Sequence, residues 1–245
     1  MTDQEAKPSR LARYIDDAKA DIARTVESTA CQPILFIGSG LSRRYFAGPS
    51  WDELLDRLAD MCPLIDKEYA YFKQTMRDPT LIGEHFAQRF QDWAWGDGRK
   101  SFPPELFDGT APASAYIKHS IAEMLKSSTP SDLHAVEAHK KEIAALTAIR
   151  PHAVITTNFD QFLEVAFPEY QPIVGQQIIR GANLSVGEIF KVHGCVSEPA
   201  SLVFTKGDYD EFSRRKKYLS AKLLTYFSVK SLPTTTPISR PIPTP

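Results

Sequence analysis

A glycine-rich turn directly follows a short apolar run near the start of the chain. Residues 34–37 read Ile-Leu-Phe-Ile, and residues 38–42 read Gly-Ser-Gly-Leu-Ser. Four apolar residues ending in such a turn are typical of a buried parallel strand that leads through a loop into a helix. In that setting, glycines let backbone N–H groups approach a phosphate, and a helix N-terminus adds favourable partial charge. The segment therefore predicts a nucleotide or dinucleotide ligand.

A tight structural turn is the alternative interpretation of the same segment. The dinucleotide fingerprint G-x-G-x-x-G needs a third glycine at position 43, where the chain has Arg43. The P-loop needs Gly-Lys-Ser/Thr after its first glycine, and Arg44 and Tyr45 do not fit that pattern. The choice between the two therefore depends on the rest of the chain.

Polar side chains follow two further apolar runs. Residues 153–157 form a β-branched run that ends at Asn158 and Asp160, and residues 187–192 end at His193. Each polar residue has a plain structural alternative: Asn158 could cap a helix, Asp160 could serve only a helix dipole, and His193 could be a core histidine. Their occurrence together with the glycine-rich turn favours a functional site.

The elements around these residues alternate between strand and helix. The predicted strands are residues 33–37, 153–157, 171–174, 187–192 and 202–204. The predicted helices are residues 9–28, 51–61 with Ser50 as N-cap, 132–149 capped by Ser131 or Asp132, 160–166 and 208–228. This order predicts an α/β fold with a doubly wound, Rossmann-like parallel sheet. Ligands of such sheets bind at the carboxyl ends of the strands, where Gly38, Asn158 and His193 fall.

Two segments differ from this pattern. Residues 64–131 are rich in aromatic side chains and prolines, which favours an inserted helical lobe that either caps a ligand site or adds core packing. Residues 231–245 are proline-rich and cannot form a regular strand or helix, so we expect a disordered tail or an aberrant, truncated or frame-shifted end. The predicted catalytic domain spans residues 1–230.

Composition excludes several classes of protein. The 245 residues are 42% hydrophobic and 24% charged, with a net charge of −1, so neither direct nucleic-acid binding nor an anionic membrane surface is expected. No apolar run approaches the ~20 residues of a membrane span, and the N-terminus lacks a signal peptide. Three widely spaced cysteines form neither a disulfide framework nor a four-cysteine zinc site. We expect a cytoplasmic protein with reduced thiols.

The ordered set of motifs resembles the sirtuin family. Residues 38–42 look like its Gly-Ala-Gly-Ile-Ser loop, residues 157–160 (Thr-Asn-Phe-Asp) look like its Thr-Gln-Asn-Ile-Asp, and residues 193–194 match its His-Gly. Residues 48–51 (Gly-Pro-Ser-Trp) and 204–209 (Phe-Thr-Lys-Gly-Asp-Tyr) are similar to the prokaryotic, zinc-free branch, whose members are often NAD+-cleaving effectors of anti-phage defence. The similarity covers roughly residues 30–228.

The resemblance implies NAD+ hydrolysis to ADP-ribose and nicotinamide, in an abortive-infection effector. Asn158 and His193 would be the catalytic residues, with His193 as general base and Asn158 on the ribose or the attacking water. NAD+ would be held by Gly38, Ser39, Gly40, Leu41, Ser42, Thr157 and Asp160. The family's paired zinc cysteines have no counterpart here, so no metal is expected, and their absence counts against protein deacylation. NAD-dependent protein deacylation is therefore kept only as an alternative to hydrolysis. An inactive NAD- or ADP-ribose-binding fragment is a further alternative. The resemblance also implies a homo-oligomer and a partner ATPase or trigger protein.

Overall fold

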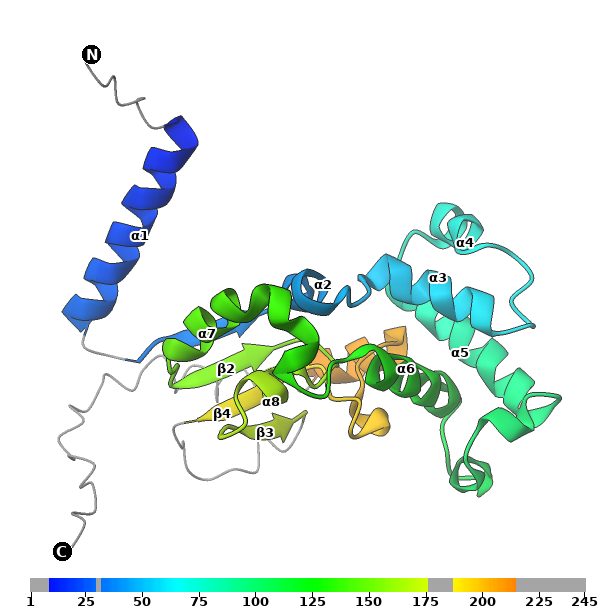
Figure 1. The fold of residues 1–245 in the computed structure, drawn as a ribbon. Helices are drawn as coiled ribbons and strands as arrows, with labels where there is room; N and C mark the ends of the chain where they lie inside the picture. Colours follow the sequence, from blue (N-terminus) through cyan, green and yellow to red (C-terminus); the bar gives the residue numbers. More distant parts are fainter. Residues whose placement is uncertain (1–8, 30–31, 176–186, 215–245) are drawn as a thin grey trace, which may run out of the picture.

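A parallel sheet of four strands organises the part of the chain that the computed structural model describes, residues 9–29, 32–175 and 187–214 (Figure 1). The strands are β1 (Ile34–Ile37), β2 (Ala153–Thr156), β3 (Gln171–Val174) and β4 (Glu188–Lys191), in the order β1-β2-β4-β3. All neighbouring pairs are parallel, and the last residues of the four strands are in register. This confirms the predicted α/β, Rossmann-like fold and brings the four carboxyl ends to one edge.

The two faces of the sheet bury alternate residues, as the pleat requires. On one face, Val154 and Ile189 pack against Leu163 of α8 (Phe162–Ala166) and Leu146 of α7 (Lys140–Ala148). On the other face, a cluster includes Ala153, Ile155, Phe190 and Phe212. The central strands β2 and β4 are buried along their whole length. β2 is accordingly almost entirely apolar, whereas β4 buries a charged residue at each end, Glu188 and Lys191.

A group of helices lies beyond the carboxyl ends of the strands (Figure 1). They are α3 (Trp51–Met61), α4 (Tyr69–Met76), α5 (Pro79–Trp95) and α6 (Ser114–Ser128), with short 3₁₀ helices at Arg99–Ser101 and Pro104–Phe107. Their apolar sides form the largest buried cluster, which also includes Phe159 and Phe204 from the region of the sheet edge. The range 64–131, predicted as a helical insertion, contains α4, α5 and α6. These helices therefore close the space above the strand ends.

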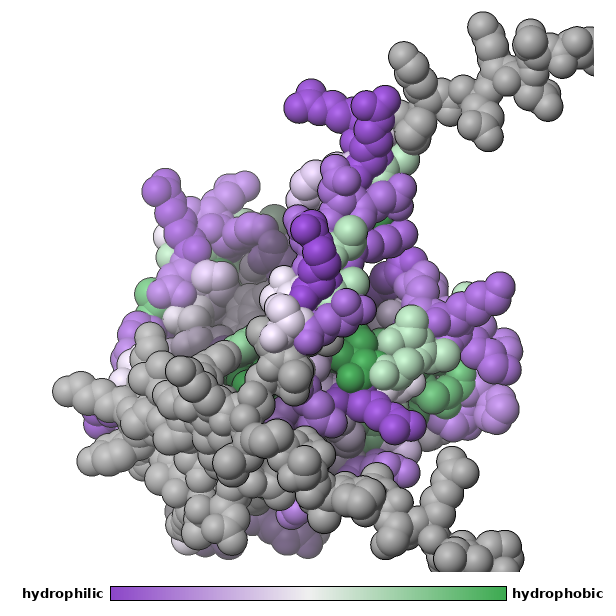
Figure 2. All heavy atoms as spheres, turned by 90° about the vertical axis from the view of Figure 1, so that its left-hand side faces the viewer, coloured by the Kyte–Doolittle hydropathy of each residue, from purple (hydrophilic) through white to green (hydrophobic). Residues whose placement is uncertain are grey.

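Helix α1 (Arg10–Thr29) precedes β1 and agrees with the predicted helix over residues 9–28. It projects from the body, and most of its surface is hydrophilic (Figure 2). Its side chains Leu11, Tyr14 and Ile22 are exposed. The helix takes no part in the site described below.

The glycine-rich segment is a helix terminus, not a loop, and this corrects the expectation for residues 38–42. Helix α2 (Ser39–Phe46) begins directly after Gly38, whose extended backbone makes it the N-cap residue. The chain thus passes from strand to helix within one residue. The first turn of α2 therefore lies at the edge of the sheet directly after β1, and the backbone N–H of Leu41 closes this turn on the Gly38 carbonyl at 3.2 Å.

The expected continuous helix over residues 132–149 is wrong. The segment forms a 3₁₀ helix, η3 (Leu133–His139), with non-helical backbone at Val136, and only then α7. Asp132 accepts a hydrogen bond from the backbone N–H of His134, which starts the tighter turn. Val136 is buried with Phe162, so apolar spacing alone does not distinguish this broken segment from a single helix.

The expected fifth strand at residues 202–204 is also wrong. Residues 202–204 follow the 3₁₀ helix η4 (Pro199–Ser201) as extended chain without a strand partner among the described residues. Leu202 and Phe204 are buried in the helical core instead, which explains their apolar character. The helix expected over 208–228 begins at residue 206 and is described to residue 214. Its remainder and the proline-rich tail lie outside the described residues.

Candidate functional site

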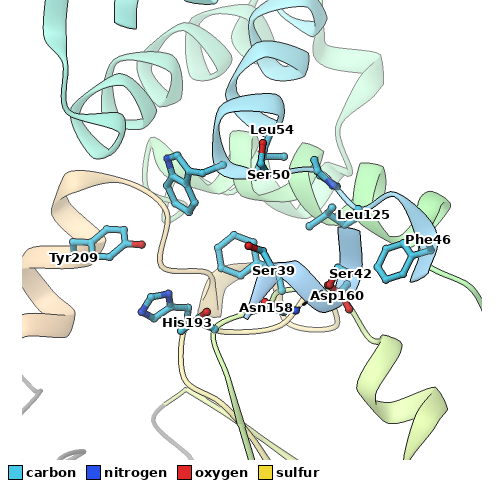
Figure 3. Close-up of a pocket in the computed structure, with 15 residues that line it drawn as sticks. Ser39, Ser42, Phe46, Ser50, Leu54, Leu125, Asn158, Asp160, His193 and Tyr209 are labelled. Atoms are coloured by element: carbon cyan, nitrogen blue, oxygen red, sulfur yellow. Dashed lines mark hydrogen bonds between the residues drawn. The ribbon is translucent and has the colours of Figure 1, made fainter. Parts of the chain in front are cut away.

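A cavity of about 220 Å³ opens at the carboxyl edge of the sheet, between the strand ends and the helices above them (Figure 3). Its floor contains Asn158 and Asp160 after β2 and His193 after β4, together with Ser39 and Ser42 of α2. The other residues that line the cavity are Phe46, Gly48, Pro49, Ser50, Trp51, Leu54, Leu125, Thr157, Phe159 and Tyr209. Three strand ends that are distant in sequence therefore meet at one space, as the fold class predicts.

A chain of hydrogen bonds fixes the orientation of the Asn158 amide. The Ser42 hydroxyl donates to Oδ2 of Asp160 at 2.7 Å, so its oxygen accepts from Nδ2 of Asn158 at 2.9 Å. The same Nδ2 donates to the backbone carbonyl of Gly38 at 3.0 Å. A carbonyl can only accept, so the nitrogen must face Gly38 and the oxygen Oδ1 must point elsewhere. Oδ1 is then the group of Asn158 that remains to accept a hydrogen bond from a ligand.

Buried polar contacts hold Asp160 in place from the opposite side. Its Oδ1 accepts from the backbone N–H of Phe162 at 3.1 Å, at the start of α8. Its backbone carbonyl accepts a hydrogen bond from the Nζ of Lys191, the last residue of β4. The Lys191 side chain is fully buried and also forms an ion pair with Glu164 of α8, with Nζ and Oε1 2.9 Å apart. The carboxylate that orients Ser42 is thus anchored to the centre of the sheet.

His193 presents an imidazole suited to accept a proton. Its ring lies edge-on to those of Tyr209 and Phe212, with centroids 5.6 and 5.2 Å apart, and no described residue forms a hydrogen bond to its nitrogens. Burial disfavours the imidazolium form and lowers the pKa of His193 below its ordinary value of 6.5. The imidazole is therefore neutral at pH 7, which is the state that a general base requires.

Gly194 is needed directly after His193. Its φ is +92°, a conformation that favours glycine, and a Cβ there would lie 2.3 Å from the carbonyl oxygen of Ser201. The glycine lets the chain turn sharply after β4, and the backbone carbonyl of His193 then accepts from the N–H of Val203 at 2.9 Å. The His-Gly pair therefore has a local structural reason as well as a chemical one.

Sequence reasoning missed the aromatic side of the cavity. Trp51 packs against Phe159, Phe204 and Tyr209, with ring centroids 5.2 to 6.4 Å apart. A capping box, in which Ser50 and Glu53 exchange hydrogen bonds, starts α3 and so sets the position of Trp51. Trp51 and Tyr209 belong to segments 48–51 and 204–209 quoted above for the resemblance, and that was the available signal for them.

The sequence-predicted site residues divide into two groups. Ser39, Ser42, Thr157, Asn158, Asp160 and His193 line the cavity. Gly38 contributes its carbonyl to the Asn158 amide, and Gly40 has open space where a Cβ would stand. Leu41 does not line the cavity, because its side chain packs into the apolar clusters around Val154 and Phe162. Leu41 can contact a ligand at this site only through its backbone.

Two further searches covered the described residues. No group of three or more His, Cys, Asp or Glu side chains within residues 9–29, 32–175 and 187–214 is placed to hold a metal ion. No helix in the same part of the chain has the length and apolar character of a membrane span. Cys62 and Cys195 are both buried free thiols.

Comparison with known families gives an independent view of the same region. Residues 152–234 match the model of the SIR2-like domain, a stretch that contains β2, β4, Asn158 and His193. No curated protein matches the chain. SIR2-like domains use NAD+, and the matched stretch supplies two of the three strand ends at the cavity. Residues 152–234 of this chain are therefore similar to the SIR2-like domain, which supports a relationship to the sirtuin-like family.

Proposed function

We propose that this chain hydrolyses NAD+ to ADP-ribose and nicotinamide, with the NAD+ bound in the cavity at the sheet edge. One observation carries the proposal: Asn158 and His193, from two different strand ends, line the same cavity as the N-terminus of α2. The acceptor can hold the ribose or the water, the neutral base can take a proton, and the helix N-terminus can bind the pyrophosphate.

The reaction breaks the bond between the ribose anomeric carbon and the nicotinamide nitrogen. The electron pair of that bond goes to nicotinamide, which leaves as a neutral molecule, and positive charge develops on the ribose. Water then forms the new bond to the anomeric carbon and gives up one proton. Overall, NAD+ and water yield ADP-ribose, nicotinamide and one proton. The protein needs to orient the ribose, position the water and accept the proton.

Asn158 and His193 have the properties that these three tasks need. The Oδ1 of Asn158, fixed by the contacts of Nδ2 with Gly38 and Ser42, accepts a hydrogen bond from a ribose hydroxyl or from the water. The neutral His193 imidazole takes the proton, directly from water or through a ribose hydroxyl. Because Ser42 and Asp160 hold Asn158 before the ligand arrives, little reorganisation is needed on binding.

The pyrophosphate would lie at the first turn of α2. The backbone N–H groups of Ser39 and Gly40 have no partner within the helix, and the helix dipole favours negative charge there. Ser39 lines the cavity beside them, and Gly40 leaves open space for close approach of a phosphate. The matched family supports this arrangement, because SIR2-like domains use NAD+.

The biological role that we propose is that of an effector in bacterial anti-phage defence. It rests on the resemblance of residues 48–51 and 204–209 to the prokaryotic branch, and both segments contribute to the cavity through Ser50, Trp51 and Tyr209. Such a role implies a homo-oligomer in the cytoplasm and a trigger protein or partner ATPase. Plaque counts and NAD+ levels during phage infection, with wild type and His193→Ala, test it: equal counts and levels would contradict the role.

The proposed reaction is tested with the purified chain and NAD+, with and without an acetyl-lysine peptide. We expect nicotinamide and ADP-ribose in equal amounts, at a rate that the peptide leaves unchanged. Nicotinamide formation only in the presence of the peptide, together with an O-acetylated ADP-ribose product, would show deacylation instead. Binding of NAD+ without any product would indicate the inactive, NAD-binding fragment instead.

A further inference from the structure

Tyr209 brings a hydroxyl group into the cavity that the proposed roles do not use. The residue lies on helix 206–214, and Figure 3 shows its side chain entering the cavity from the side of His193, with the hydroxyl towards the interior. Its ring is edge-on to His193 at 5.6 Å and to Trp51 at 6.2 Å between centroids. The phenol therefore lies between the proposed base and the aromatic side of the cavity.

The turn that carries Tyr209 is held rigidly. Oδ2 of Asp208 accepts hydrogen bonds from the backbone N–H groups of Phe204 and Thr205 and from the hydroxyl of Thr205. Oδ1 of the same carboxylate accepts from the Nζ of Lys118 at 2.6 Å, and both side chains of this ion pair are largely buried. The Tyr209 N–H donates to the Thr205 carbonyl at 3.1 Å. Tyr209 is thus anchored to α6 through its neighbour.

The hydroxyl itself has no protein partner in the described part of the chain. Neither the cavity-lining side chains nor the neighbouring turn forms a hydrogen bond with it, although the ring is packed on two sides. Burial, and then the Asp208 carboxylate, raise the pKa of Tyr209 above its ordinary value of 10. The group therefore keeps its proton across the working pH range and is a hydrogen-bond donor.

We propose that Tyr209 is a substrate-positioning residue, whose hydroxyl donates a hydrogen bond to an oxygen of the ribose that carries nicotinamide. The inference rests on the proposed function, since it places that ribose between Asn158 and His193. The polar floor, formed by Asn158, Ser42 and Asp160, meets one side of the sugar. Tyr209 supplies a donor from the opposite side, next to the base, and so fixes the rotation of the sugar relative to His193.

A purely structural role for Tyr209 makes a different prediction. If only the ring matters, by packing against His193 and Trp51, then removal of the hydroxyl changes nothing in binding or rate. Tyr209→Phe keeps the ring and removes the donor, so it separates the two roles. Tyr170→Phe is the matched control, because it removes a tyrosine hydroxyl that donates to the carbonyl of Pro151, outside the cavity.

The experiment measures steady-state NAD+ cleavage, ADP-ribose binding by calorimetry and thermal unfolding for wild type and both variants. For Tyr209→Phe we expect a 5- to 10-fold lower kcat/KM and a 5- to 10-fold weaker ADP-ribose affinity, the effect of losing about one hydrogen bond. Tyr170→Phe is expected to keep the wild-type values of both. The melting temperature of Tyr209→Phe is expected to fall no further than that of Tyr170→Phe.

Each remaining outcome decides a different question. If wild type cleaves NAD+ and Tyr209→Phe equals it in rate and affinity, the role of Tyr209 is overturned and the proposed hydrolysis stands. If Tyr209→Phe loses activity only together with a larger loss of stability, the ring packing is its role and the inference is overturned. If wild type binds ADP-ribose without cleaving NAD+, hydrolysis fails, and the affinities still decide on Tyr209. If wild type neither cleaves nor binds, both fail.

Discussion

Asn158 and Ser42, 116 residues apart in sequence, share a hydrogen bond of 2.9 Å between Nδ2 and Oγ in the buried floor of the cavity. This contact joins the end of β2 to the first turn of α2. It also fixes the orientation of the Asn158 amide. The Ser42 hydroxyl donates its hydrogen bond to Asp160, so its oxygen can only accept from the amide nitrogen. The proposed chemistry therefore depends on a serine that need not touch the substrate.

Replacement of Ser42 tests this dependence. Ser42→Ala leaves Oδ2 of Asp160 and one hydrogen of the Asn158 amide without their buried partner, so the free energy of unfolding should fall by about 1–3 kcal/mol. We expect kcat/KM for NAD+ to fall at least ~10-fold, since the Asn158 amide is no longer fixed. Ser127→Ala, which removes an exposed hydroxyl on α6, is the control for chemical denaturation and kinetics. Equal kcat/KM in wild type and Ser42→Ala would contradict the role of Ser42.

Gly40→Ala tests the pyrophosphate site. Gly40 lies in the first turn of α2, and a Cβ there would meet no atom within 4 Å, so alanine should raise the free energy of unfolding by about 0.4–1 kcal/mol. If a phosphate approaches the backbone there, NAD+ affinity measured by calorimetry should fall by about tenfold (~1.4 kcal/mol). Gly96→Ala, at the end of α5 and outside the cavity, is the control. Unchanged affinity in Gly40→Ala would place the phosphates elsewhere.

Lys191→Met tests the buried ion pair between Lys191 and Glu164, next to Asp160. The variant leaves Glu164 without its cation in a largely buried position, and removal of one member of a buried ion pair costs about 3–5 kcal/mol of unfolding free energy. Adding Glu164→Leu removes the unpaired carboxylate, so the double variant should recover a large part of the loss. Urea unfolding measures both. A Lys191→Met variant as stable as wild type would show that the ion pair contributes nothing.

The pH dependence of activity reports on His193. Burial lowers the pKa of His193, so the neutral base persists below pH 6.5 and is lost only as the pH falls through this lowered pKa. We expect kcat/KM to be level from pH 8 to about 6.5 and to fall at lower pH. A midpoint of this acid limb above pH 7 would contradict the assignment of His193 as the buried, neutral base.

The meeting of the strand ends at one site could be predicted from the sequence, because a parallel α/β fold places all carboxyl ends at the same edge of the sheet. Apolar runs that end in Gly38, Asn158 and His193 each mark a carboxyl end, and the register of β1, β2 and β4 places all three at one edge. The capping box at Ser50 was likewise predictable, because it depends on residues three positions apart. Local patterns were sufficient for these elements.

The helical side of the cavity could not be predicted in the same way. Leu202 and Phe204 have the apolar pattern of a strand but are buried against helices, because core burial and sheet burial select the same residues. The position of Tyr209 depends on the ion pair between Lys118 and Asp208, 90 residues apart, which no local pattern reveals. The position of Tyr209 at the cavity is therefore determined by tertiary contacts between α6 and helix 206–214, which sequence patterns do not predict.

The most direct test of NAD+ hydrolysis at this cavity is the rate of nicotinamide release from NAD+ by wild type, Asn158→Ala and His193→Ala. ADP-ribose, the second product, is quantified in the same reactions. We expect wild type to release equal amounts of both products. We expect rates about 10²–10⁴-fold lower for His193→Ala, the range expected for loss of a general base. Circular dichroism establishes that the variants are folded. NAD+ cleavage that continues at the wild-type rate in both folded variants would contradict the account.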